Sequence, residues 1–279
     1  MAALIAPKAD GQSTELVPGS SRASAPRWRL RPGAAMLSIG KLRQGQERYY
    51  LNTVARGVED YYLGSGEAPG RWTGRGAALL GVSGVVRPEQ LRAVLDGRHP
   101  TDNTSLITVR RKDRLAGFDL TFSAPKGVSL LFALGDPELS LAVRRAHDAA
   151  VGQALGYLER EAGEVLRGHN CTVRLAGDGF VAAGFRHRSS RAGDPQLHTH
   201  VLTANMARGS DGRWSALDGR QLYWQAKTAG TLYQTALATS FVIWGWSSRC
   251  GTTGNASSPA SRSGCYAPSP AAGSRSSSI

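Results

Sequence analysis

The sequence of 279 residues predicts an α+β domain in which strands and helices pack in layers. Several short segments alternate apolar and polar residues, which is typical of strands with one buried face. Other segments repeat apolar residues near a period of 3.6, as an amphipathic helix does. The expected strands are 36–42, 105–111, 116–123, 171–176, 179–187 and 196–206, and the expected helices are 43–64, 88–97, 125–134, 137–165 and 221–240.

Local signals support these elements in turn. MLSIGKL, which begins at Met36, alternates like a strand. Pro88 opens PEQLRAVLDG, a short helix with proline in its first turn and glycine at its end. Pro125 likewise starts a helical pattern that runs to about Leu134. The longest helical pattern, 137–165, repeats apolar side chains near the helical period, so it is expected to bury one face.

Composition divides the chain into three parts. Residues 1–35 are rich in Ala, Pro, Ser, Gly and Arg and are expected to be a disordered extension. Residues 36–240 are the expected domain. Residues 241–279 contain no acidic residue and no apolar period, so we expect a disordered or aberrant tail. Two hypotheses follow: Met36 is the true start, and the reading frame is lost near residue 242, which would leave the domain incomplete at its C-terminal end.

The charge of the chain favours a nucleic-acid partner. The formal net charge is +13, and a basic domain suggests a polyanion, although an arginine-rich composition from a GC-rich genome would give the same excess. No stretch approaches the roughly 20 apolar residues of a membrane span. Cys171, Cys250 and Cys265 are odd in number and lack metal spacing, which favours a reduced, cytoplasmic setting. The sequence has no GxxxxGK[ST] loop, so no ATPase activity is expected.

Three of the six histidines cluster in FRHRSSRAGDPQLHTHVLTAN. His198 and His200 alternate on an expected strand, so both imidazoles project from one face. A hairpin through RSSRAGDP would bring His187 across from them. Three converging imidazoles form a facial ligand set with open positions for water or substrate, whereas ordinary half-buried strand histidines are the alternative. All-imidazole ligation suits Zn, Mn, Ni or Fe better than Mg, and the sequence leaves the choice among divalent ions (Mg, Mn or Zn) open.

Four tyrosines come as two pairs, Tyr49–Tyr50 and Tyr61–Tyr62, in the expected helix 43–64. A phenol can act as a nucleophile when a base or a metal activates it. Packing of an amphipathic helix is the alternative explanation, since tyrosine is common at half-buried positions.

Asp119 lies in the strand-like segment GFDLTFSAPKGVS. Alternation places Asp119, Thr121 and Ser123 on one face of this strand. A carboxylate there has three possible roles: it faces solvent, it orients a ligand histidine, or it takes a phenolic proton.

Together these motifs resemble the MobF-type relaxases, the TrwC/TraI-like enzymes of conjugative plasmids. The resemblance rests on MLSIGKL, the doubled tyrosines, FDLTFSAPKGVS and FRHRSSRAGDPQLHTHVLTAN, and spans roughly residues 36–240. It implies a mainly antiparallel five-stranded sheet with helices packed on it, an HUH-endonuclease-like relaxase fold. It also implies metal-dependent, site- and strand-specific nicking of single-stranded DNA and strand transfer at a plasmid transfer origin, through a 5′-phosphotyrosyl intermediate. Such a transesterification needs no nucleotide cofactor.

The resemblance assigns roles residue by residue. Tyr49 matches the initiating nucleophile and Tyr61 the second tyrosine of strand transfer, with Tyr50 and Tyr62 in support. Asp119 matches the acidic residue that contacts the histidine triad and assists the nucleophile. The implied metal ligands are His187, His198 and His200.

The resemblance also names the partners. Single-stranded DNA of a transfer origin is the implied substrate, and other relaxosome and coupling proteins are further candidates. Basic side chains near the motifs would contact the DNA backbone. These are Arg186, Arg188 and Arg191, together with Arg110, Arg111 and Lys112.

Two other functions stay open at this point. The first is a zinc-type hydrolase that uses the same three histidines and a bound hydroxide. The second is an inactive, truncated relaxase remnant that only binds single-stranded DNA. The second alternative arises because relaxases of this family are expected to continue past residue 240 with helices that clamp the DNA and with a helicase domain.

Overall fold

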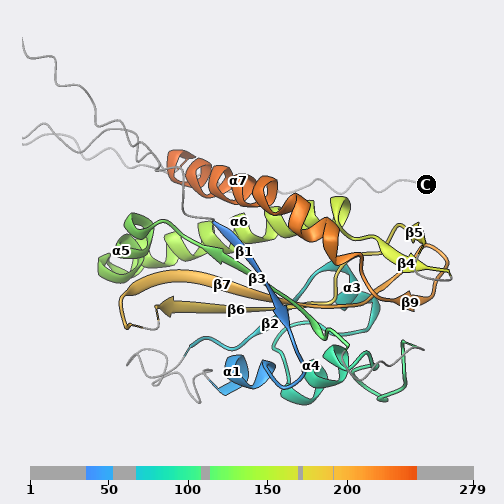
Figure 1. The fold of residues 1–279 in the computed structure, drawn as a ribbon. Helices are drawn as coiled ribbons and strands as arrows, with labels where there is room; N and C mark the ends of the chain where they lie inside the picture. Colours follow the sequence, from blue (N-terminus) through green and yellow to red (C-terminus); the bar gives the residue numbers. More distant parts are fainter. Residues whose placement is uncertain (1–35, 53–66, 108–113, 169–171, 191, 244–279) are drawn as a thin grey trace, which may run out of the picture. The chain divides into compact units, whose positions relative to one another are not determined.

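The computed structural model describes residues 36–52, 67–107, 114–168, 172–190 and 192–243, which belong to one compact unit. Its centre is a five-stranded sheet in the order β1-β3-β7-β6-β2, in which every neighbouring pair is antiparallel (Figure 1). This confirms the predicted α+β class and the antiparallel five-stranded sheet. The strands of this sheet are β1 (Leu37–Leu42), β2 (Arg71–Thr73), β3 (Gly117–Ser123), β6 (Ala182–Ser189) and β7 (Pro195–Ala204).

Helices cover both faces of the sheet, as Figure 1 shows. The two long helices α6 and α7 pack against each other on one face, with α5 beside α6, and the short helices α1 and α4 lie on the other. Local signals set the start of α6. Asp136 caps it by accepting a hydrogen bond from the backbone N–H of Leu139, and Pro137 occupies its first turn. The helices are α1 (Glu47–Asn52), α3 (Arg75–Leu79), α4 (Pro88–Leu95), α5 (Lys126–Leu134), α6 (Pro137–Glu161) and α7 (Gly219–Ile243).

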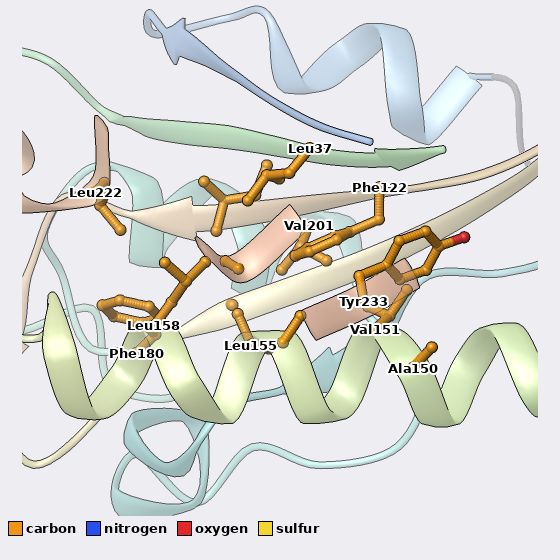
Figure 2. Close-up of a cluster of buried hydrophobic side chains, with 14 of the residues drawn as sticks. Leu37, Phe122, Ala150, Val151, Leu155, Leu158, Phe180, Val201, Leu222 and Tyr233 are labelled. Carbon is orange, nitrogen blue, oxygen red and sulfur yellow. The ribbon is translucent and has the colours of Figure 1, made fainter. Parts of the chain in front are cut away.

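The main core lies between the sheet and the α6–α7 pair (Figure 2). Leu158 of α6 and Tyr233 of α7 are fully buried against Phe122 of β3 and Val201 of β7. A second core on the other face packs α4 and α1 against the sheet. Because both faces of the sheet are covered, its central strands hold their register rigidly.

Strand β7 is the central strand of the sheet, because it pairs with β3 on one side and with β6 on the other. Its alternation sends Leu197, Thr199 and Val201 toward the α6–α7 side, where Leu197 and Val201 join the main core. His198 and His200 therefore face the side of α1.

Several predicted elements differ from the observed ones. Segment 105–111 does not begin as a strand, since Ser105 forms only an isolated bridge to Arg98, and residues 108–111 lie outside the described part. Segment 171–176 contributes β5 (Val173–Leu175), which pairs with β4 (Val165–Arg167) in a separate ribbon. The sequence analysis did not predict β2, β4 or α3. The helix expected over 137–165 ends at Glu161, because β4 then begins a new strand.

The structure describes only part of the three regions that the sequence analysis predicted. The extension 1–35 and residues 244–279 lie outside the described residues, as do 53–64 of the helix expected over 43–64. Helix α7 continues to Ile243, slightly past the expected domain limit at 240. Within the described ranges, no helix combines the length and apolar character that a bilayer crossing requires. A further short ribbon is formed by β8 (Ala207–Arg208) and β9 (Trp214–Ser215).

Candidate metal and tyrosine site

The three clustered histidines converge across the β6–β7 hairpin. His187 pairs directly with His198 in the register, and His200 follows two residues later on the same face. One ring nitrogen from each of the three lies within 4.8 Å of the others. The hairpin geometry expected from the sequence is therefore confirmed, and it gathers three imidazoles at one point.

Burial favours the neutral form of two of these rings, those of His187 and His198. Desolvation is the largest cause that lowers the pKa of His187, to about 4, and the neighbouring imidazoles of His200 and His198 lower it further. Burial is also the main cause that lowers the pKa of His198. A neutral imidazole carries a lone pair on one nitrogen, which is the form that binds a metal.

Hydrogen bonds fix which nitrogen carries that lone pair. His198 Nδ1 lies 2.8 Å from the carbonyl oxygen of Gln196, which can only accept, so Nδ1 donates and the lone pair is on Nε2. His200 Nδ1 lies 2.9 Å from both carboxylate oxygens of Asp119, and the same reasoning applies. Metal-binding histidines typically donate their other N–H to such an acceptor. The donor set thus fits a divalent ion held by Nε2 of His198, Nε2 of His200 and one ring nitrogen of His187.

Asp119 is the hub that connects the histidines to a tyrosine. It lies on β3, and its carboxylate accepts hydrogen bonds from His200 and, at 3.2 Å, from the Thr121 hydroxyl. The Tyr50 hydroxyl donates to Asp119 Oδ2 at 2.7 Å. Of the three roles open to Asp119 from the sequence, exposure to solvent is wrong. The carboxylate orients a histidine and contacts a phenol.

The two adjacent tyrosines of α1 occupy different environments. Tyr50 is 9% exposed, and its ring centroid lies 5.0 Å from that of His200. Tyr49 is 49% exposed, and its ring centroid lies 6.4 Å from that of His187. Both rings therefore reach the histidine cluster, one buried beside Asp119 and the other accessible from outside. Tyr61 and Tyr62 lie outside the described residues.

A cavity of about 680 Å³ opens over these groups. Glu67, which the sequence analysis did not single out, is one of its carboxylates, and no spacing or motif in the sequence marks it. The lining residues are Gly40, Lys41, Leu42, Gly45, Gln46, Tyr49, Tyr50, Glu67, Asp119, Thr121, His187, Ser189, Ser190, His198 and His200.

The arginines expected to contact DNA are not equivalent. Arg186 pairs with Thr199 in the register, so it lies on the α6 face, where it forms an ion pair with Asp148 at 2.8 Å. This placement, on the opposite side of the sheet from the cavity, removes the reason for expecting Arg186 to bind DNA. Arg188 forms an ion pair with Glu67 at 3.3 Å. Arg191 and the basic segment 110–112 lie outside the described residues.

Conjugation proteins of Escherichia coli are among the known proteins with similar sequences. The multifunctional conjugation protein TraI of Escherichia coli K12 is 35% identical over 187 residues, which cover 65% of this chain and 10% of TraI. A second Escherichia coli TraI is 38% identical over 162 residues, covering 57% of this chain and 9% of TraI. The matched region therefore spans about a tenth of the length of these curated relatives.

Solved structures of the conjugative relaxase TrwC are also similar. A copper-bound complex with oriT DNA has 33% sequence identity and a TM-score of 0.64, and the match covers 79% of this chain and 74% of that one. A metal-bound complex with oriT DNA gives the same TM-score at 34% identity and the same coverage of both chains. The TrwC complex with a 27-mer that comprises the recognition hairpin and cleavage site has a TM-score of 0.61 at 32% identity, over 79% of this chain and 73% of that one. The TrwC relaxase family profile matches residues 43–257, and the chain belongs to this family.

Proposed function

We propose that this chain nicks one strand of DNA at a plasmid transfer origin and transfers it by transesterification, as a metal-dependent conjugative relaxase. The observation that carries the proposal is the meeting of three imidazoles, the Asp119 carboxylate and two phenols in one cavity. Membership of the TrwC relaxase family supports the same reaction. In this proposal the chain works in the cytoplasm on single-stranded DNA, with relaxosome and coupling proteins as further partners.

The proposed ligands are His187, His198 and His200. A divalent ion held there would polarise the non-bridging oxygens of the scissile phosphate and stabilise the charge of the transition state. The protein's own part is to keep the imidazoles of His187 and His198 neutral by burial and to hold His200 in one orientation through Asp119.

Tyr49 is the proposed nucleophile, because its exposed ring lies at the cavity where a DNA strand can reach it. Its phenolic oxygen attacks the phosphorus and forms a 5′-phosphotyrosyl bond, while the bond from phosphorus to the 3′ oxygen breaks and leaves a 3′-hydroxyl. The phenolic proton passes to the Asp119 carboxylate, directly or through Tyr50, whose hydroxyl already donates to Asp119, and a proton from solvent water completes the 3′-hydroxyl. Attack of a 3′-hydroxyl on the phosphotyrosyl bond reverses the step, and Tyr61 serves as the second tyrosine.

A covalent-adduct assay tests the proposal. The protein is incubated with labelled single-stranded transfer-origin DNA and Mn²⁺ or Mg²⁺, and a scrambled oligonucleotide of the same composition tests site specificity. A protein–DNA band that resists denaturation and disappears with EDTA is the expected result. His198→Ala should abolish the band. The matched control His99→Ala should not, because His99 pairs with Asp102 on the surface away from the cavity.

The other outcomes identify the alternatives. Strand cleavage without an adduct would favour a hydrolase with a metal-bound hydroxide. Binding of the DNA with neither cleavage nor adduct, by folded and metal-loaded protein, would identify a remnant that only binds single-stranded DNA.

A further inference from the structure

A buried polar chain lies directly behind the histidine ligands. Thr199 stands between His198 and His200 on β7, and its side chain points through the sheet to the opposite face. There its hydroxyl lies 2.8 Å from Nε2 of His147, a fully buried histidine of α6. Thr199 thus ties the strand segment between the two histidines to the helical layer through its side chain.

The chain continues to α7. His147 Nδ1 lies 2.8 Å from the hydroxyl of Tyr233, which is 0% exposed. Figure 2 shows the Tyr233 ring beside Phe122, at a centroid distance of 5.6 Å, and Phe122 is the β3 partner of Thr199 in the register. One imidazole therefore joins α6, α7 and the ligand strand.

The hydrogen bonds from Tyr233 through His147 to Thr199 join neutral groups with defined donor and acceptor roles. Burial lowers the pKa of His147 to about 3 and raises the pKa of Tyr233, so both groups stay neutral. A neutral imidazole donates from one nitrogen and accepts at the other, and each nitrogen here has one hydroxyl partner. A shift of β7 would leave these buried polar atoms without partners, which is costly. Apolar contacts alone tolerate such shifts more easily.

We propose that the Tyr233–His147–Thr199 chain is a positioning device for the metal site. It fixes the backbone of β7 at Thr199, and thereby sets the spacing and tilt of the two imidazoles that flank Thr199. The three residues do not touch the ion or the DNA. The inference rests on the proposed metal-binding role of the triad, and it makes α7 part of the metal site although that helix lies on the other face of the sheet.

Strand β7 supplies a matched control for the Thr199 hydroxyl. Thr203 lies on the same strand and the same face, and it is 0% exposed against 7% for Thr199. Its hydroxyl has no hydrogen-bond partner among the described residues. Thr199→Val and Thr203→Val therefore remove the same atom from equivalent buried positions, and only the first breaks the chain.

Cobalt binding separates positioning from mere stabilisation. Co²⁺ is titrated into the full chain, and both the affinity and the visible absorption spectrum of the bound ion are recorded. Thr199→Val should weaken binding by about tenfold, the lower end of the effect of losing a partner that orients ligands, and should shift the spectrum. Thr199→Ser keeps the hydroxyl and should restore both. Thr203→Val should bind within about twofold of the unchanged protein.

Tyr233→Phe is the second variant, since it removes only the far hydroxyl and would serve if Thr199→Val failed to fold. It should lower the affinity in the same direction, by about threefold or more. Equal affinity and spectra for Thr199→Val, Tyr233→Phe and the unchanged protein would overturn the inference, as would equal losses in Thr199→Val and Thr203→Val. If the unchanged protein bound no Co²⁺, the proposed metal role of the triad would fail first, and the inference with it.

Discussion

The Tyr50 hydroxyl donates a 2.7 Å hydrogen bond to Asp119 across 69 residues of sequence. The same carboxylate accepts from His200 at 2.9 Å. The Asp119 carboxylate thus connects α1, which carries the tyrosines, to β7, which carries His200. Its two contacts are with side chains that have different proposed roles. The effects of substitutions at Tyr49, Tyr50 and Asp119 should therefore differ in kind.

Tyr49→Phe should abolish the covalent adduct with single-stranded transfer-origin DNA, because the attacking oxygen is lost. Tyr50→Phe should keep the adduct and slow its formation by about tenfold, the cost of losing a hydrogen bond worth about 1.4 kcal/mol in the transition state. Single-turnover adduct formation, followed on denaturing gels, distinguishes the two variants. An adduct that persists in Tyr49→Phe and vanishes in Tyr50→Phe would exchange the roles of the two tyrosines.

Asp119→Asn should weaken metal binding by about tenfold or more, since His200 loses a charged acceptor for its Nδ1 proton. Calorimetric titration with a divalent metal measures the change. Asp96→Asn is a suitable control, because Asp96 accepts a hydrogen bond from Gln44 outside the main cavity. Unchanged affinity in Asp119→Asn would mean that the carboxylate does not orient the ligand.

The stability of the metal-free protein should fall in mild acid because of His147. Its pKa in the folded state is about 3, against 6.5 for the unfolded chain, so folding keeps it neutral. Its contribution is fully present above pH 6.5 and is lost as the pH falls from 6.5 toward 3, at up to about 1.4 kcal/mol per pH unit.

Urea unfolding in EDTA at pH 7 and pH 5 measures this dependence. Buried ligand histidines contribute in the same direction, so the useful quantity is the difference between the unchanged protein and His147→Gln. Asp148, Arg186 and the neutral hydroxyls of Thr199 and Tyr233 remain in both proteins. The variant should lose less stability between the two pH values. An equal loss in both would show that His147 does not titrate on unfolding.

Arg186→Gln should change DNA affinity by less than about twofold and leave its salt dependence unaltered, because the guanidinium pairs with Asp148 behind the sheet. Fluorescence anisotropy with labelled single-stranded DNA at several salt concentrations gives both quantities. A salt slope reduced by about one unit would place Arg186 on a phosphate after all.

Much of the site followed from local patterns in the sequence. Alternation around His198 and His200, with a turn-forming segment before them, was enough to predict a hairpin that places His187 opposite. Strand alternation also put Asp119 and Thr121 on one face, and both contact His200. Period and turn chemistry are local properties, so they can be predicted without knowing the fold.

The remainder depends on pairing between distant segments. The three residues of β2 become a strand only because β6 supplies their hydrogen bonds. Residues 105–107 alternate like a strand but do not form one, and Ile107 is buried in the second core instead. His147 looks like an ordinary helix residue in the sequence, since nothing local connects it to Thr199, 52 residues away.

The antiparallel ladder gives the site a further property. Asp119 on β3, the pair on β7 and His187 on β6 belong to three adjacent strands, and a slip of β7 by one residue would turn both of its imidazoles to the helical layer. The histidine cluster can therefore form only when β6 and β7 pair in this register, and Asp119 reaches it only when β3 pairs correctly with β7. A divalent ion bound to the three histidines, as proposed, would therefore favour this register of β7 over any other.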